Sequence, residues 1–131
     1  MRKFGNPTSN RANGNNDGYF RIFRLAELYL NYAEALNEAE ASDIAPDAAV
    51  DAVNAVRDRV GMPDIPYGLA KDEFRKRLRN ERRVEFAFEE QRFYDVRRWK
   101  ILHETDRILT GMRETDEGKY ERFVVSRRNA Y

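Results

Sequence analysis

The chain has 131 residues, of which 36% are charged, 41% hydrophobic and 12% aromatic. This length suits one domain with a sizeable core, and the large side chains exclude the composition of a disordered chain. The 24 lysines and arginines nearly cancel the 23 aspartates and glutamates, so bulk charge gives no argument for binding nucleic acid or an anionic membrane.

The chain contains no cysteine, which excludes disulfides, thiol nucleophiles, thiolate metal sites and a lipidated cysteine within it. No apolar run approaches the roughly 18 residues that span a membrane, and no hydrophobic signal core follows Met1 to Lys3. We therefore expect a soluble chain that carries no targeting signal. Because it opens in a polar stretch and stops directly after a strand-like run, we expect it to be an excised piece of a larger protein.

The first predicted helix follows an irregular lead-in. Residues 1–18 are rich in glycine, proline, asparagine and aspartate, which favour turns. From Tyr19 to Ala39, apolar residues recur at three and four and predict the core face of a helix. They are Ile22, Leu25, Tyr29, Tyr32 and Leu36. Ala26, Ala33 and Ala35 supply small positions where another helix could approach.

A second helix is predicted after a loop at residues 40–45. Pro46 suits a first helical turn, and Gly61 and Pro63 form a strong stop signal. The predicted apolar face consists of Ala49, Val53, Val56 and Val60. These two helices, joined by a short loop, have the layout of an antiparallel helix pair of tetratricopeptide type, although the repeat signature is absent.

The third predicted helix starts near residues 69–71 and runs through the stretch ERRVEFAFEE. A break at Glu90 and Gln91 divides it from a fourth segment, residues 92–102. Farther on, the turn at Glu117 and Gly118 separates two strand-like runs, Ile108 to Arg113 and Tyr120 to Ser126, which predict a small hairpin.

The predicted fold class is mainly α: a tetratricopeptide-like helix pair, a third long helix and a small β-hairpin near the C-terminus. We expect residues 1–131 to form a single domain or an excised fragment. Its parts would be the lead-in at 1–18, a helical core at 19–102, and a loop with the hairpin at 103–131.

A stripe of carboxylates marks the third helix. Glu81, Glu85 and Glu89 stand four residues apart, on the same predicted side as the apolar residues Phe74, Leu78 and Phe88. A helical di-metal site would need glutamate–histidine pairs on two helices, and the chain has one histidine, His103. A glycosidase needs two carboxyls across a cleft, which one helix does not supply. We predict no catalytic residue, metal site or cofactor.

Arginines are the available partners for these carboxylates. We predict that Arg57 or Arg59 of the second helix reaches Glu81 or Glu85 and forms a structural clamp. A nucleic-acid surface is the alternative for the basic residues of the third and fourth segments, with Phe93 and Trp99 as stacking groups. The alternating glutamates argue against it, since charges three and four residues apart commonly pair.

Three stretches resemble the C-terminal half of the SusD/RagB family. They are RLAELYLNYAEALNEA at residues 24–39, AVNAVRDRVGMP at 52–63 and NERRVEFAFEEQRFYDVRRW at 80–99. The resemblance covers roughly residues 19–125. It implies a lipid-anchored protein on the outer membrane of a Gram-negative bacterium, which captures glycans or other nutrients for a SusC-like TonB-dependent transporter and is not an enzyme.

This sequence lacks the signal peptide, the lipidation cysteine and the long N-terminal portion that the family has, so it looks like a C-terminal segment. No ligand-binding residue is assigned, because the matching motifs look structural. The predicted structural charge network consists of Arg57, Arg59, Glu81, Arg82, Glu85, Glu89, Arg92, Asp95, Arg98 and Trp99. The alternative function is a helical protein-interaction module of tetratricopeptide-like type.

Overall fold

The computed structural model describes residues 22–105 and 108–127, which form two units. The first unit, up to Glu89, contains the helices α1 (Leu25–Ala39), α2 (Asp47–Asp58) and α3 (Lys71–Glu85). The second, from Glu90, contains α4 (Gln91–Arg98), the short α5 (Leu102–Thr105) and the strands β1 (Ile108–Glu114) and β2 (Tyr120–Arg127). The prediction of a mainly helical chain with a C-terminal hairpin is confirmed. The predicted lead-in at residues 1–18 and the first three residues of the first predicted helix, 19–21, lie outside the described part.

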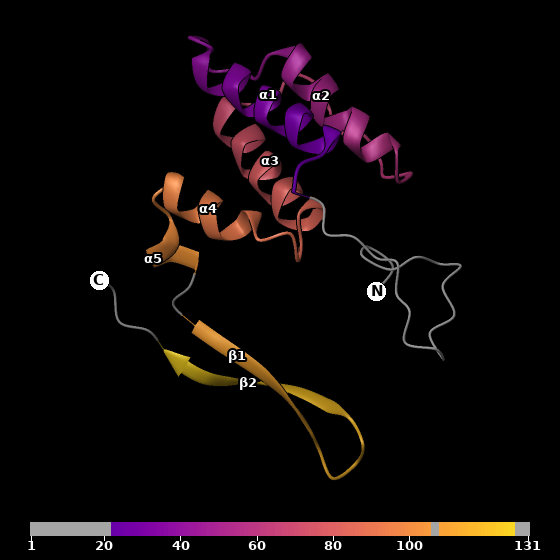
Figure 1. Ribbon diagram of the computed structural model, residues 1–131, viewed down its shortest axis with the longest axis vertical. Helices are drawn as coiled ribbons and strands as arrows, with labels where there is room; N and C mark the ends of the chain where they lie inside the picture. The colour runs from indigo at the N-terminus through magenta and orange to yellow at the C-terminus, as the bar shows by residue number, and fades with distance from the viewer. Residues whose placement is uncertain (1–21, 106–107, 128–131) are drawn as a thin grey trace. The chain divides into compact units, whose positions relative to one another are not determined.

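The three helices of the first unit enclose one hydrophobic core. Helix α1 packs against both α2 and α3 (Figure 1). The largest fully buried apolar side chains come from all three helices: Leu30, Val50, Val53, Phe74 and Leu78. Burial of each such side chain contributes about 1.5–3 kcal/mol to stability.

The core face predicted for α1 was only partly right: Leu36 packs against the core, but the other predicted residues are exposed. Leu30 and Ala33 are buried, whereas Leu25 is 63% and Tyr32 is 54% exposed. Helix α1 carries two adjacent apolar stripes, and the one with smaller residues and the buried Asn37 faces the core. Periodicity alone does not tell two such stripes apart.

Helix α2 largely agrees with its prediction. Pro46 is its N-cap, and Ala49, Val53 and Val56 are buried. Val60 was wrongly placed in the core: it is 53% exposed, because the helix ends at Asp58. Gly61 has the left-handed φ of +68° that its role as a stop signal requires.

Hydrogen bonds order the two segments that connect the helices of the first unit. Ala45 N donates to Leu69 O at 2.9 Å, which fixes the α1–α2 loop beside the start of α3. The side-chain amide of Asn54, on α2, makes two hydrogen bonds with the backbone of Ile65. Asn54 Nδ2 donates to Ile65 O at 3.1 Å, and Ile65 N donates to Asn54 Oδ1 at 2.8 Å. This pair of bonds orders the segment between α2 and α3.

Helix α3 ends at Glu85, before the predicted break at Glu90 and Gln91. Phe88 and Glu90 both have left-handed backbone conformations, with φ of +66° and +65°, which interrupt the helix. Phe88 was wrongly predicted to share the apolar side of α3: it is 72% exposed. The predicted fourth segment is divided into α4 and α5.

The hairpin pairs β1 with β2 in antiparallel register, from Glu114 opposite Tyr120 to Ile108 opposite Arg127, with one irregularity next to Thr110. Gly118 closes the turn with a φ of +71°. Gly111 lies under the ring of Phe123, where a Cβ atom would come within 3.0 Å of the ring. The glycine therefore makes room for a cross-strand aromatic side chain.

Candidate functional site

Glu85, at the end of α3, joins all three helices of the first unit. Its carboxylate accepts hydrogen bonds from Arg59, which follows α2, at 2.8 and 3.0 Å. It also accepts one from Arg24, the N-cap residue of α1. The side chain of Glu85 is only 12% exposed. One part-buried carboxylate is thus shared by two guanidinium groups from different parts of the chain.

Glu89 completes this arrangement from the segment after α3. Arg24 donates two parallel hydrogen bonds to the Glu89 carboxylate, from Nε to Oε2 at 2.8 Å and from Nη2 to Oε1 at 2.9 Å. Arg24 Nη2 also donates to the backbone oxygen of Glu85 at 2.8 Å. Burial lowers the pKa of Arg24, but its hydrogen bonds to Glu89 and Glu85 outweigh burial and raise it above the usual value. Such bidentate, charge-assisted pairs fix geometry as well as charge.

A second contact links α2 to α3 one turn earlier. Arg57 Nη1 donates to Glu81 Oε2 at 2.5 Å, and Arg57 Nε donates to the backbone oxygen of Pro63 at 2.7 Å. The sequence suggested that Arg57 or Arg59 reaches Glu81 or Glu85, and the structure contains two such contacts, Arg57 with Glu81 and Arg59 with Glu85. Arg57 also anchors the segment that follows α2.

Arg82 and Phe86 are buried residues next to these ion pairs. Arg82 is 2% exposed and donates to Asn31 Oδ1 at 2.6 Å, with Glu34 at 3.9 Å from its Nε atom. The ring of Phe86, 3% exposed, has the guanidinium carbons of Arg24 and Arg82 at 4.9 and 5.3 Å from its centroid. Cations over an aromatic face are attracted by its quadrupole, so Phe86 connects the two arginines.

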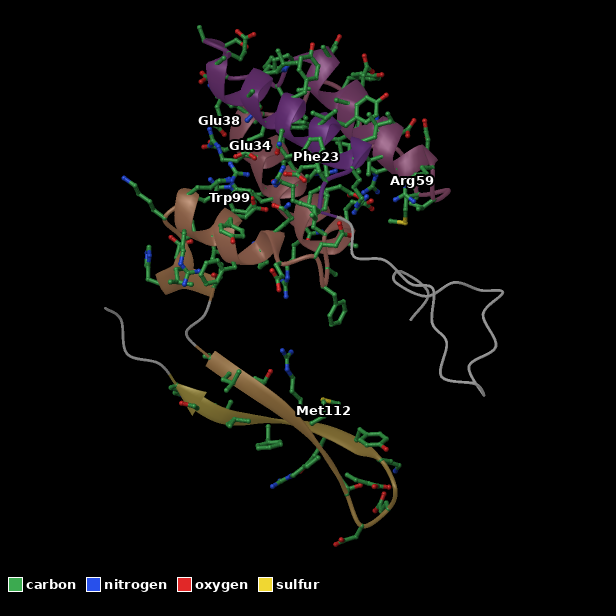
Figure 2. All side chains as sticks on the ribbon, in the orientation of Figure 1. Phe23, Glu34, Glu38, Arg59, Trp99 and Met112 are labelled. Carbon is green, nitrogen blue, oxygen red and sulfur yellow. The ribbon has the colours of Figure 1, made fainter. Side chains whose placement is uncertain are left out.

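We call this group the helix-end cluster. Figure 2 labels two of its members, Glu34 on α1 and Arg59 after α2. Its charged and aromatic members are Arg24, Glu34, Arg57, Arg59, Glu81, Arg82, Glu85, Phe86 and Glu89. All of them belong to the first unit.

The other predicted network residues lie on or next to α4, in the second unit. Asp95 is 2% exposed and accepts a hydrogen bond from Arg98 Nε at 2.9 Å. The Arg98 guanidinium carbon lies 4.8 Å from the centroid of the Trp99 ring, and Arg92 is half-buried. Six of the ten predicted residues therefore belong to the first unit and four to the second.

Sequence reasoning missed Arg24, Glu34 and Phe86. Arg24 is 61 and 65 residues from its two carboxylate partners, so no local spacing reveals these contacts. Phe86 stands four residues after Arg82, a spacing that brings side chains together on a helix and could have indicated their contact.

The geometry of the helix-end cluster favours a structural role. Its carboxylates accept hydrogen bonds from arginines of other parts of the chain and so connect segments that are distant in the sequence. Within residues 22–105 and 108–127, no group of three or more histidine, aspartate or glutamate side chains is arranged to hold a metal ion. In the same part of the chain, no helix is long and apolar enough to cross a membrane.

The sequence profile of the SusD family matches residues 1–129. The chain belongs to the SusD family. Two SusD-like proteins of Formosa agariphila, P2 and P25, are 40% and 38% identical to it over 88 and 84 residues, each 62% of this chain. The resemblance carried by the three sequence stretches is therefore confirmed.

A crystal structure of a SusD-like protein from Bacteroides fragilis has the same fold over 84% of this chain, with 44% sequence identity and a TM-score of 0.74. This SusD-family chain spans 17% and 15% of the two Formosa proteins and 20% of the Bacteroides protein. It therefore corresponds to less than a fifth of the two Formosa relatives and to a fifth of the solved one.

Proposed function

We propose that this chain is the scaffold segment of a non-enzymatic nutrient-binding protein, with glycans as the ligand class. The observation that carries the proposal is the family match over residues 1–129, since the resemblance implies capture of nutrients rather than their conversion. The whole protein would act at the outer face of the outer membrane, held there by a lipid anchor. It would deliver its ligand to a SusC-like TonB-dependent transporter.

The helix-end cluster supports the scaffold role of this segment. Its carboxylates accept hydrogen bonds from arginines at the start of α1 and at the end of α2, and the Phe86 ring lies close to Arg24 and Arg82. Partners this close leave little of Glu85 or Glu89 open to a ligand: their side chains are 12% and 6% exposed. We therefore propose that Arg57, Arg59, Glu81, Arg82, Glu85 and Glu89 hold helices together and do not contact a nutrient.

The test uses a full-length protein that contains this segment. Affinity electrophoresis and calorimetry with a panel of polysaccharides should detect binding to at least one glycan, and chromatography of the incubated glycan should show no cleavage. Binding of no glycan, or release of shorter products, would contradict the proposal. Co-purification with the transporter tests the partner separately, because it does not depend on which glycan is bound.

A variant separates the scaffold role from ligand contact. Arg59→Ala removes a partner of Glu85 whose side chain is 56% exposed. If the cluster is structural, this variant should melt at a lower temperature and bind the glycan with an unchanged dissociation constant below its melting point. An unchanged melting temperature with weaker binding would instead indicate that Arg59 contacts the ligand.

A further inference from the structure

The local sequence does not explain why helix α3 ends at Glu85. Neither glycine nor proline occurs between Lys71, where α3 begins, and Arg98, where α4 ends. Residues 86–90 read FAFEE, and none of these residue types normally ends a helix. The backbone nevertheless leaves the helix after Glu85, and α4 begins only at Gln91. The cause of this break therefore lies outside residues 86–90.

The backbone of the break is strained. Phe88 and Glu90 have φ values of +66° and +65°, which bring Cβ too close to the following carbonyl oxygen. Neither side chain is buried in return: Phe88 is 72% exposed, and Glu90 is exposed as well. Glu89 N donates to Phe86 O, three residues back, at 3.0 Å, whereas an α-helix bonds four residues back. The surrounding structure therefore has to maintain this conformation.

Arg24 contacts the backbone carbonyl at which the helix stops. Its Nη2 atom donates to Glu85 O at 2.8 Å. In a continuing α-helix, the same oxygen would accept a hydrogen bond from Glu89 N. The Arg24 guanidinium also holds the Glu89 carboxylate, through the bidentate pair at 2.8 and 2.9 Å. Arg24 thus takes the acceptor that a continuing helix would use and fixes the residue that would donate to it.

The environment of Arg24 makes this contact difficult for water to replace. The side chains of Arg24, Glu85 and Glu89 are 16%, 12% and 6% exposed. The guanidinium carbon of Arg24 also lies 4.9 Å from the centroid of the buried Phe86 ring. Basic side chains at the C-terminal end of a helix satisfy its last carbonyls and interact favourably with its dipole. Here the basic side chain comes from a residue 61 positions earlier in the chain.

We infer that Arg24 is a side-chain cap for the C-terminal end of α3, and that residues 86–90 form a switch that this cap controls. With Arg24 in place, α3 ends at Glu85. Without it, α3 continues through residues 86–90, and Phe88 and Glu90 take right-handed helical φ values. Because Arg24 immediately precedes α1, a movement at the start of α1 changes the end of α3. This inference is independent of which nutrient the protein binds.

NMR spectroscopy of the 131-residue chain tests the switch, with Arg24→Met as the variant. Methionine removes the guanidinium and keeps an unbranched side chain beside Phe86. We expect the ¹³Cα secondary shifts of residues 86–90 to move to helical values, and a contact between Glu85 Hα and the Phe88 amide proton to appear. Unchanged shifts at Phe88 and Glu90 in the folded variant would overturn the inference.

Arg59→Met is the matched control, because Arg59 shares the Glu85 carboxylate with Arg24. Arg59 donates to the two carboxylate oxygens at 2.8 and 3.0 Å, whereas Arg24 also donates to the backbone oxygen. The control should melt at a lower temperature and keep the parent shifts at residues 86–90. Equal shift changes in the two variants would overturn the inference, since the loss of an ion pair would then explain both.

A second change, Glu90→Gly, should restore the break in the Arg24→Met chain. Glycine adopts a positive φ without steric cost and is a poor helix former. The shifts of residues 86–90 should therefore return toward the parent values. Helical shifts that persist in the double variant would contradict a switch governed by backbone strain.

Arg24→Lys replaces Arg24→Met if the methionine variant does not fold, as judged by helical circular dichroism. Its ammonium group keeps the charge but lacks the planar fork that contacts the Glu85 backbone oxygen and the Glu89 carboxylate together. We expect the same helical shifts at residues 86–90. Unfolding of both variants would show that Arg24 is required for the whole helical unit and not for the break, and would also overturn the inference.

Discussion

The helical unit and the hairpin are stabilised in different ways. The helices α1 to α3 contribute side chains that are fully buried, such as Leu30 and Phe74, and the ion pairs of the helix-end cluster join residues 24 to 65 positions apart. In the described strands no residue is buried, and the ion pair between Arg113 and Glu121 joins residues eight positions apart. Distant residues hold the helical unit together, whereas the hairpin depends on its own register.

This difference in burial determines how much an ion pair contributes to stability. Glu85 is 12% exposed and bonded to two arginines, and loss of its carboxylate removes a partner of Arg24, which is only 16% exposed and has little access to water. Arg113 and Glu121 are 64% and 46% exposed, where water replaces a lost partner and a pair contributes at most about 1 kcal/mol. Similar ion pairs are therefore expected to differ several-fold in their effect on stability.

Glu85→Ala should have the largest effect. It removes the carboxylate shared by Arg24 and Arg59, and we expect the free energy of unfolding of the helical unit to fall by about 2–4 kcal/mol. Thermal melting followed by circular dichroism at the helical wavelength measures the change. An unchanged melting curve would contradict the clamp role of the helix-end cluster.

The matched control for Glu85→Ala is Glu73→Ala on the same helix. Glu73 is 46% exposed and pairs with Arg77 one turn away. Such a pair contributes about 0.3–0.5 kcal/mol, so this variant should melt within a degree or two of the parent chain. Equal losses in the two variants would mean that helix propensity, and not the cluster, accounts for the effect.

Much of the fold could be predicted because its signals are local. Gly61 and Gly118 have left-handed φ values, and two strand-like runs on either side of the turn signal at Glu117 and Gly118 predicted the hairpin. Two failures have physical causes. Both stripes of α1 are apolar, so periodicity selected mostly exposed residues. The apolar pattern of α3 continues to Phe88 although the backbone has already left the helix.

The helix-end cluster was only partly predictable. Arg57 and Arg59 could be matched to Glu81 and Glu85 because adjacent helices with opposite charges favour such contacts. Arg24 could not, since its position beside the end of α3 follows from how α1 crosses the other helices. Contacts that depend on the packing of three helices leave no periodic signal in the sequence.

Gly111→Ala tests whether the hairpin depends on its own register. The added Cβ would lie 3.0 Å from Phe123 Cε1 and 3.1 Å from Val125 Cγ2, and we expect such overpacking to destabilise the hairpin by about 1–3 kcal/mol. Amide exchange should accelerate in both strands, with no change in the helical unit. A second change, Phe123→Leu, should restore part of the protection by making room. Faster exchange in α1 to α3 would show that the two parts are coupled.

Glu90→Gly should stabilise the chain modestly. Glu90 has a φ of +65°, a conformation that costs a residue with a side chain about 1–2 kcal/mol, part of which is offset by the greater flexibility of glycine in the unfolded chain. We expect a net gain of about 0.5–1 kcal/mol in denaturant unfolding. Glu73→Gly, in the regular helix α3, should instead lose about 1 kcal/mol. A loss for Glu90→Gly would mean that the Glu90 side chain has a stabilising contact worth more than the backbone strain.

The smallest expected effect is a dependence on acidic pH at the pair of Glu38 and Arg75. Two hydrogen bonds from Arg75, at 2.5 and 2.8 Å, lower the pKa of Glu38 below its ordinary value. Because the folded-state pKa is the lower one, the stabilisation is complete above the unfolded-state pKa of about 4.3 and is lost as the pH falls through the folded-state pKa. The Glu38 side chain is 45% exposed, so solvent screening keeps the contribution below about 1 kcal/mol.

NMR titration of the Glu38 carboxyl measures this shift, and Arg75→Met should return the pKa toward its ordinary value. Glu38→Gln should lose less stability than the parent chain between pH 6 and pH 3, since it has no carboxylate to protonate at this position. An equal loss in the two proteins, together with an ordinary Glu38 pKa, would mean that this pair contributes as little to stability as the exposed pair of Arg113 and Glu121. In that case burial at the helix-end cluster, and not the number of hydrogen bonds, would distinguish the ion pairs that stabilise this chain.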